Sequence, residues 1–290
     1  MPLFPNADLH SHSTHSDGAL APAEVAALAQ AGGVDLWALT DHDTLAGQAL
    51  AREAALDLGL AWVGGVEISV SFLTETIHVL GLGVDVADAT LDAGLAHLRA
   101  GRVARAQAMG QSLARAGIRG AFEGAAALAP NLPSISRTHF ARWLVQTGHA
   151  PSVGEVFHHY LRSGKPGYVP HTWATLGAAV GWIRRAGGVA VIAHPGRYRL
   201  GLSGENALLA AFTDLGGAGI EVVCGSHSPA EVQLAAQQAR TWGLAASRGS
   251  DFHAPDESRV LPGMLAALPP QLTPVWQRAP LAQAVACARA

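Results

Sequence analysis

Short apolar runs alternate along the chain with longer stretches that have helical periodicity. About seven of these runs have the length and composition of buried β-strands, at residues 7–12, 35–40, 60–66, 76–82, 188–193, 219–223 and 244–247. Helical patterns lie between them, at about residues 21–30, 44–58, 174–187, 205–216 and 229–242. Pro22 near the start of the first helix and Gly32-Gly33 after it are typical helix boundaries.

Strands that are apolar throughout and alternate with helices are typical of a parallel sheet covered on both faces. A His, Asp or Glu residue stands at or just after the carboxyl end of nearly every predicted strand. In a (β/α) barrel these ends meet at one face, where active-site residues gather. An open doubly wound sheet is the alternative and would place them along one crevice. The pattern therefore predicts an α/β fold with a polar site at one end of its strands.

The alternation is interrupted between about residues 91 and 173, where helical patterns and loops replace the strands. We expect a mostly helical subdomain to be inserted there, so that residues 1–90 and 174–290 form the main domain. Between Asp92 and Glu123 the insertion has no acidic residue but has five arginines: Arg99, Arg102, Arg105, Arg115 and Arg119. The first three have near-helical spacing and form either a solvated helix face or a surface for phosphate.

The composition excludes several classes of protein. The chain of 290 residues is 49% hydrophobic and 14% charged, which predicts a sizeable core and little disorder. A net charge of −3 argues against a protein that coats nucleic acid. The two cysteines, Cys224 and Cys287, do not suggest a disulfide framework and fit a reducing cytoplasm. We find no signal-peptide pattern and no apolar run of membrane-spanning length, and therefore expect a cytoplasmic protein.

The first predicted strand carries the sequence Asp8-Leu9-His10-Ser11-His12, and Asp17-Gly18 follows shortly after it. Residues two apart on a strand share a face, so the imidazoles of His10 and His12 would converge. A turn at Asp17-Gly18 would let the Asp17 carboxylate fold back toward them. Two imidazoles and a carboxylate suit Zn²⁺, Mn²⁺ or Fe²⁺ better than Mg²⁺ or Ca²⁺.

The other predicted strands add side chains of the same kind. The full set contains six histidines and three carboxylates: His10, His12, Asp17, His42, Glu67, His78, His194, Asp251 and His253. Packing alone does not explain so many ionisable residues at one end of a sheet, because unpaired buried polar groups are costly. They suffice for up to three divalent ions, with Glu67 able to bridge. Clustered divalent ions suit the hydrolysis of phosphate esters.

The segments DLHSHSTHSDG, LTDHDT, GVEIS, HVLGLG, IAHPG and GSDFHAP resemble those of the polymerase-and-histidinol-phosphatase (PHP) family of metal-dependent phosphoesterases. The resemblance implies a distorted (β/α)7 barrel. It also implies three ions, which family members commonly fill with Mn²⁺, Zn²⁺ or Fe. By resemblance, the ligands of the first ion are His10, His12, Glu67 and Asp251. Those of the second are Glu67, His78 and His194, and those of the third are Asp17, His42 and His253.

The insertion resembles that of the 3′,5′-nucleoside bisphosphate phosphatases and of the related 5′→3′ exoribonuclease RNase AM. The likeness rests on Arg102-Val-Ala-Arg105, Ile135–Arg142, Gly164–Val169 and Ser226-His227-Ser228. It implies removal of the 3′-phosphate from adenosine 3′,5′-bisphosphate (pAp) to give AMP, with trimming of short 5′-phosphorylated RNA as a related activity. Arginine binds phosphate bidentately, and we nominate five residues for the 5′-phosphate: Arg102, Arg105, Arg137, Thr138 and His139.

For the reaction we expect in-line attack on the 3′-phosphorus by a metal-bridging hydroxide, with up to three ions per chain and Mn²⁺ as the expected metal. The residues expected at the reacting centre are Asp17, His42, Glu67, His194 and His227, with His227 or a bound water as the proton donor to the leaving oxygen. Asp41 and Asp43 flank His42 and are expected to orient it. Two rival interpretations remain: another phosphomonoesterase of the family, such as a histidinol phosphatase, and a non-catalytic module like those of bacterial DNA polymerases.

Overall fold

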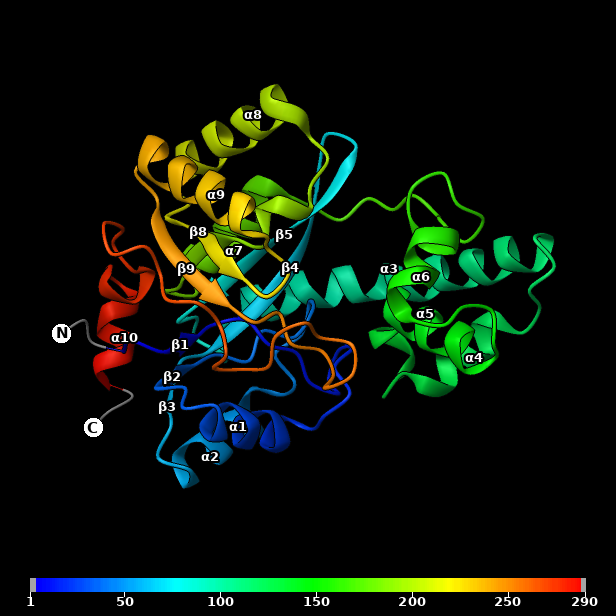
Figure 1. The fold of residues 1–290 in the computed structure, drawn as a ribbon, viewed down its shortest axis with the longest axis horizontal. Helices are drawn as coiled ribbons and strands as arrows, with labels where there is room; N and C mark the ends of the chain where they lie inside the picture. The colour runs from blue at the N-terminus through cyan, green and yellow to red at the C-terminus, as the bar shows by residue number, and fades with distance from the viewer. Residues whose placement is uncertain (1–3, 288–290) are drawn as a thin grey trace.

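The protein, described as a computed structural model over residues 4–287, has an α/β fold with two sheets (Figure 1). The smaller sheet pairs β1 (Ala7–Asp8), β2 (Leu36–Trp37) and β3 (Ala61–Trp62) in parallel. The larger sheet has the order β6-β4-β5-β7-β8-β9. Its strands are β4 (Gly65–Phe72), β5 (Glu75–Leu82), β6 (Ala174–Thr175), β7 (Val189–Ile192), β8 (Gly219–Cys224) and β9 (Ala245–Gly249).

The two sheets are joined at two places: the segment that follows β1 pairs with β9 and the residues after it, and the segment that follows β2 pairs with β4. The amide of Leu9 donates to the carbonyl of Arg248 at 3.0 Å, and Ser11 forms a β-bridge with Phe252. At the second place, His42 forms a bridge with Glu67. The regular ladders of β1 and β2 are only two residues long, shorter than the predicted strands, because the chain then diverges into the polar segments that carry His10 and His42.

The prediction of a uniformly parallel sheet is wrong at one place. Strands β4 and β5 form an antiparallel hairpin, and β5 is also antiparallel to β7. The hairpin turns at Leu73, which has a φ of 52° and no glycine or asparagine beside it, so the usual turn signals are missing. The consequence is functional: because β5 runs the opposite way, His78 opposite Ser69 lies near the edge where the parallel strands end.

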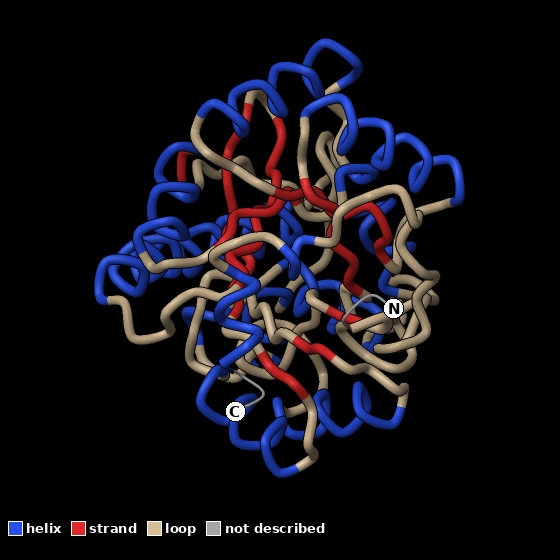
Figure 2. Tube along the Cα trace, turned by 90° about the vertical axis from the view of Figure 1, so that its left-hand side faces the viewer, coloured by secondary structure: helices blue, strands red, loops and turns tan. Residues whose placement is uncertain are grey.

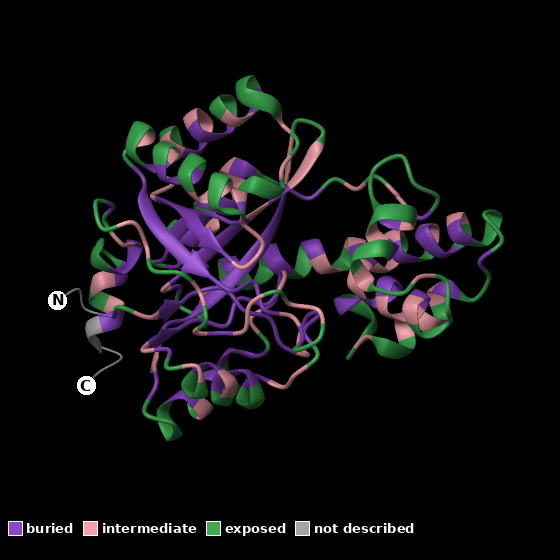
Figure 3. Cartoon of the chain, in the orientation of Figure 1, coloured by how far each residue is buried: buried purple, intermediate pink, exposed green. Residues whose placement is uncertain are grey.

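Helices surround the strands (Figure 2). In the α/β body they are α1 (Pro22–Ala31), α2 (Gln48–Asp57), α7 (Leu176–Arg185), α8 (Gly201–Asp214), α9 (Pro229–Trp242) and α10 (Leu281–Cys287), with 3₁₀ turns at Pro195–Arg197 and Val275–Gln277. Buried side chains concentrate on the strands and on the inner helix faces (Figure 3). Within residues 4–287 no helix is both long and apolar enough to cross a membrane. Cys224 is buried and not disulfide-bonded, and the side chain of Cys287 lies outside the described part.

The segment between β5 and β6 is helical. It contains α3 (Ala89–Arg115), α4 (Ala121–Leu128), α5 (Arg137–Gln146), α6 (Val153–Val156), a 3₁₀ turn (Leu132–Ser134) and a π-helix (Phe157–Leu161). Helix α3 extends away from the sheets, and α4 to α6 pack at its far end (Figure 1). A hydrophobic cluster that includes Leu113, Phe140 and Leu144 holds these helices together. The division of the chain into domains at residues 91 and 173 stays a prediction.

Candidate metal centre

The nine residues expected to bind metal come together at one end of the strands. His10, His12 and Asp17 follow β1, His42 follows β2, and Glu67 and His78 lie on the β4–β5 hairpin. His194 follows β7, and Asp251 and His253 follow β9. Within residues 4–287, three groups could each hold an ion: His12, Asp17, His42 and His253; His10, His12, Glu67 and Asp251; and His42, Glu67 and His78. His194 adjoins the last group.

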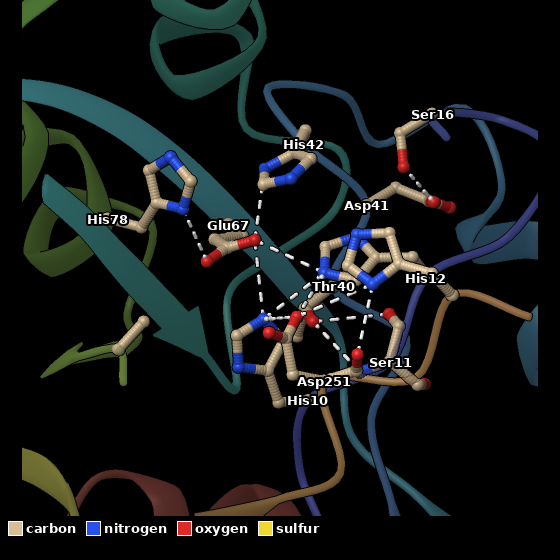
Figure 4. A network of polar contacts seen from close by, with 12 residues as sticks. His10, Ser11, His12, Ser16, Thr40, Asp41, His42, Glu67, His78 and Asp251 are labelled. Atoms are coloured by element: carbon tan, nitrogen blue, oxygen red, sulfur yellow. Dashed lines mark hydrogen bonds and ion pairs between the residues drawn. The ribbon is translucent and has the colours of Figure 1, made fainter. Parts of the chain in front are cut away.

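Glu67 lies at the centre of this cluster (Figure 4). Its Oε1 atom is 2.9 Å from His78 Nδ1 and 3.0 Å from His194 Nε2. Its Oε2 atom is 2.9 Å from His42 Nδ1, 3.2 Å from His12 Nε2 and 3.3 Å from His10 Nε2. One fully buried carboxylate thus faces five imidazoles and has an oxygen available to each of two neighbouring ions.

The other two carboxylates face further imidazoles of the cluster, and both lie near His253. Asp251 Oδ1 lies 3.3 Å from the Nε2 atoms of both His10 and His12. Asp17 Oδ1 lies 3.4 Å from His253 Nε2 and 3.9 Å from His42 Nε2. Asp251 Oδ1 is also 3.7 Å from His253 Nδ1, so each carboxylate faces at least two imidazoles, the mixture of donors that transition metals prefer.

The donor atoms fit divalent metal ions because several of them are buried without other partners. In the described part of the chain, Asp17 Oδ1, His42 Nδ1 and Glu67 Oε2 form no hydrogen bond. His42 Nδ1 and Glu67 Oε2 are only 2.9 Å apart, yet their geometry is not that of a hydrogen bond. Buried polar atoms are seldom left unsatisfied, and an ion between these atoms would satisfy them together.

The cluster also keeps its carboxylates ionised. Burial by itself raises the pKa of Glu67, but His42, His78 and His10 outweigh burial and hold that pKa well below its ordinary value. Burial likewise raises the pKa of Asp17, and His42 and His253 more than reverse the effect. Burial lowers the pKa of His194 to about 4, with Arg197 acting in the same direction. These carboxylates are therefore anionic and His194 is neutral at pH 7, as metal ligands must be.

Unusual backbone conformations accompany the cluster. Asp43, His194 and Asp251 have φ angles of 52°, 26° and 53°, in a region that residues other than glycine seldom adopt. All three lie at the polar end of a strand. Gly249 lies directly against His10, which leaves no room there for a side chain. The chain is thus bent sharply at the points where it presents its ligands, as is common at functional sites.

Asp41 and Asp43, which were expected to orient His42, are hydrogen-bonded to neighbouring segments of the chain. Asp41 accepts hydrogen bonds from Ser13 N at 2.8 Å and from the hydroxyls of Ser13 and Ser16, both at 2.6 Å. Asp43 accepts from Ser69 N at 2.7 Å and from the Ser69 hydroxyl at 2.9 Å. These contacts fix the loop after β1 and join the segment of His42 to β4.

The sequence reasoning missed Glu221, which is fully buried in β8. Its Oε1 atom is 2.9 Å from His10 Nδ1, and its Oε2 atom accepts the amide of His194 at 2.6 Å. A proton on His10 Nδ1 leaves Nε2 free to face Glu67 and Asp251. The signal that could have revealed this residue is a single charge inside the apolar run at residues 219–223. Arg197, whose NH1 is 2.7 Å from Asp251 Oδ2, was missed too.

Replacement of Glu221 by glutamine is expected to weaken metal binding, because the amide is a poorer acceptor for His10 Nδ1–H and does not fix the ring. Partners of this kind typically contribute 10- to 100-fold to metal affinity, and we expect a loss of about 10-fold. Titration of the metal-free variant with Mn²⁺ measures it, with Glu231→Gln at the partly exposed start of α9 as the control. Unchanged Mn²⁺ affinity would contradict the role given to Glu221.

A cleft opens beside the metal cluster. Its lining includes cluster residues on one side and residues of the helical segment on the other: Asp17, His42, Ser69, Thr76, His78, Arg102, Arg105, Ser136, Arg137, Thr138, Phe157 and Trp173. A smaller adjoining cavity is also lined by Arg102, Arg105 and Arg137. The cleft therefore joins a set of metal donors to a set of guanidinium groups.

The guanidinium groups of the cleft are close enough to repel one another. Burial and the neighbouring Arg137 and Arg102 lower the pKa of Arg105 to about 9. Burial also lowers the pKa of Arg137. Arg105 and Arg102 lie over the Trp173 ring, with CZ 5.3 and 4.8 Å from its centroid. An anion placed among these cations would relieve the repulsion, which favours a phosphate there.

Three residues that were expected to bind the 5′-phosphate or to donate a proton have other contacts. Arg102 lines the cleft but also pairs with Asp43, so it supports the segment of His42. His139 is buried, accepts the amide of Ser136 on Nδ1 at 3.0 Å and does not line the cleft. His227 is 3.1 Å from the Val222 carbonyl through Nδ1 and accepts the amide of Gly196 on Nε2 at 3.3 Å. Backbone groups thus occupy both nitrogens of His227, which is not part of the metal cluster.

An α/β fold whose strand ends present clustered imidazoles and carboxylates next to arginines is that of a metal-dependent phosphoesterase. The chain belongs to the PHP family, since the model of the PHP domain matches residues 8–165.

Full-length relatives agree with this assignment. The chain is 51% identical to a 3′,5′-nucleoside bisphosphate phosphatase of Chromobacterium violaceum, over 94% of this chain and 95% of that protein. It is 43% identical to the 5′-3′ exoribonuclease Rnm of Escherichia coli, over 93% and 92%. Among solved structures, an amidohydrolase from Chromobacterium violaceum with bound sulfate and no metal superposes with a TM-score of 0.90. That structure is 50% identical and covers 94% of this chain and 95% of its own.

Proposed function

We propose that this protein is a phosphatase that removes the 3′-phosphate of nucleoside 3′,5′-bisphosphates and converts pAp to AMP and phosphate. The observation that carries the proposal is the cleft that has metal donors on one wall and the guanidinium groups of Arg105 and Arg137 on the other. A substrate with two phosphates can use both walls at once. The relative that is 51% identical bears the name of this activity.

In the proposed reaction, side chains of this chain bind the metal ions and orient the two phosphates of the substrate. The nine donors hold up to three divalent ions, with Mn²⁺ proposed and Zn²⁺ or Fe as alternatives. When bound, such ions neutralise phosphoryl oxygens and activate water. Glu67 faces both the His10–His12 pair and the His78–His194 pair, so it would be a ligand to ions held by either pair. Arg105, Arg137 and Thr138 bind the distal 5′-phosphate and place the 3′-phosphate at the metal donors.

We further propose that residues 1–90 and 174–290 form a distorted (β/α)7 barrel and that residues 91–173 are an insertion that binds substrate. The bridges of Ser11 with Phe252 and of His42 with Glu67 support the closure of the sheets. The separate hydrophobic cluster of the helical segment supports the insertion. The helical segment contributes Arg105 and Arg137 to the cleft, which supports its role in binding substrate.

A second activity, 5′→3′ trimming of short RNA that carries a 5′-phosphate, is proposed on the same site. The relative that is 43% identical is named a 5′-3′ exoribonuclease. An RNA end offers the same pair of groups as pAp, a terminal 5′-phosphate and a phosphate ester on the 3′-oxygen of the first ribose. The arginine wall disfavours histidinol phosphate, which has one phosphate, and the complete set of nine donor residues disfavours a non-catalytic module.

The test is phosphate release from pAp with Mn²⁺, compared with 3′-AMP, 5′-AMP and histidinol phosphate. We expect pAp to exceed 3′-AMP by about 10-fold or more in kcat/KM, since a charge-assisted hydrogen bond contributes roughly 1.5–3 kcal/mol. Little release from 5′-AMP is expected. A preference for histidinol phosphate, or release from none of the four by protein that binds Mn²⁺, would overturn the proposal.

A further inference from the structure

The turn before helix α5 connects the two walls of the cleft, and Ser136 is the residue at which they meet. We propose that Ser136 is a positioning residue that couples the binding of the distal phosphate to the binding of a metal ion by Asp17. The inference rests on the proposed function, because it uses the same cleft, and it assigns to Ser136 a role that acts through Asp17.

The Ser136 side chain makes contacts in two directions. Its hydroxyl donates to Asp17 Oδ2 at 2.9 Å and accepts the amide of Thr138 at 3.0 Å, which caps α5. The amide of Ser136 donates to His139 Nδ1, and His139 is buried in the helical segment. The hydroxyl is thus held in one orientation by the helix end, and it presents its hydrogen to the carboxylate of Asp17.

This hydrogen bond decides which oxygen of Asp17 remains for a metal. Asp17 is 2% exposed, and its Oδ1 atom, which forms no hydrogen bond, faces His253 and His42. With Oδ2 engaged by Ser136, the carboxylate cannot turn without breaking a partly buried hydrogen bond. The group of donors formed by His12, Asp17, His42 and His253 is therefore arranged by a residue that belongs to the helical segment.

The same turn carries the proposed phosphate ligands. Arg137 and Thr138 come directly after Ser136, and all three residues line the cleft. Helix α5 is also fixed to the loop after His253, since Arg142 forms a two-pronged ion pair with Glu257 at 2.6 and 2.8 Å. A phosphate that holds the start of α5 in place also holds the Ser136 hydroxyl against Asp17. By linkage, a metal ion on Asp17 must favour phosphate binding to the same degree.

The first experiment measures Mn²⁺ binding to metal-free protein without nucleotide, by the loss of the free Mn²⁺ signal in electron paramagnetic resonance. Ser136→Ala is expected to weaken one Mn²⁺ site by about 10-fold. Ser136→Thr, which keeps a hydroxyl, should restore affinity to within about 3-fold of wild type. Ser152→Ala is the matched control, because Ser152 caps α6 in the same segment through Glu155 N but is not among the contacts of Asp17. Equal Mn²⁺ binding by Ser136→Ala and Ser152→Ala proteins would overturn the proposal.

The second experiment repeats the titration with AMP, whose 5′-phosphate serves as the distal phosphate. AMP should tighten the affected Mn²⁺ site by about 5-fold or more in wild-type protein and in Ser152→Ala, and by less than 2-fold in Ser136→Ala. No effect of AMP in wild-type protein, or an equal effect in Ser136→Ala, would overturn the coupling. Mn²⁺ binding without nucleotide does not depend on the substrate, so failure of pAp hydrolysis alone would leave the first result intact.

Discussion

Substitution of Glu67 by glutamine is expected to lower pAp turnover by about 10³-fold at saturating Mn²⁺, because an amide cannot supply an anionic oxygen to each of two ions. Glu67 contacts five imidazoles through both oxygens, more than any other carboxylate of the cluster. Bound ions contribute several kcal/mol to stabilising charge in the transition state, and about 4 kcal/mol corresponds to 10³-fold. Steady-state kinetics with pAp measures the effect, with Glu53→Gln on the exposed face of α2 as the control.

The same variant should differ from wild type in stability when metal-free. The histidines hold the pKa of Glu67 below its ordinary value of 4.5. Ionised Glu67 therefore stabilises the fold at pH above 4.5, and this contribution is lost as the pH falls through the lower folded-state pKa. The metal-free variant should unfold at a lower temperature than wild type at pH 7. Turnover within 10-fold of wild type would contradict the bridging role, even if the thermal difference were observed.

Much of the metal cluster could be predicted because its residues follow regular patterns. His10 and His12 are two apart, and their Nε2 atoms lie 3.2 Å from each other, although the ladder of β1 ends at Asp8 and only Ser11 between them forms a β-bridge. His42, His194 and Asp251 lie within four residues of the ends of apolar runs, and parallel strands bring such positions to one edge. Glu67 closes the third predicted apolar run and lies in the structure at the start of β4.

Other features could not be read from local patterns. His78 lies inside an apolar run, and its place in the cluster depends on the reversal of β5, which follows from a hairpin without the usual turn residues. Glu221 could not be predicted, because its own strand is otherwise apolar and its partner His10 is 211 residues away in the sequence. The contact of Ser136 with Asp17 spans 119 residues. Contacts of this kind arise from tertiary packing, which hydrophobic periodicity does not predict.

His139 and His227 show the opposite error, in which a chemically capable side chain was given a role that the fold uses otherwise. Burial lowers the pKa of His139 to about 4, so this ring is neutral at pH 7 and adds no positive charge for a phosphate. Its Nδ1 atom caps the turn at Ser136 instead. A histidine three residues after a serine is compatible with both a phosphate ligand and a helix cap, and only the surrounding contacts distinguish them.

Removal of the guanidinium groups of Arg105 and Arg137 is expected to abolish the preference for a substrate with two phosphates. For the double variant Arg105→Ala/Arg137→Ala we expect kcat/KM for pAp to fall by about 10²- to 10³-fold, since each charge-assisted contact contributes roughly 1.5–3 kcal/mol. Both kcat and KM should change, because the distal phosphate positions the reacting one. Hydrolysis of 3′-AMP should change by less than about 3-fold, because 3′-AMP has no group for this wall. Steady-state kinetics with both substrates at several Mn²⁺ concentrations measures the change in kcat and KM.

The comparison of the two substrates separates this effect from damage to the fold or to the metal site. Arg115→Ala/Arg119→Ala is the matched control, because both arginines come from the same run of basic residues but are exposed. Loss of metal or of stability would lower the hydrolysis of pAp and 3′-AMP together, whereas loss of the phosphate wall lowers only that of pAp. An equal fall for both substrates would mean that Arg105 and Arg137 support the helical segment, with Arg105 bonded to Val169 at 3.2 Å, and do not bind phosphate.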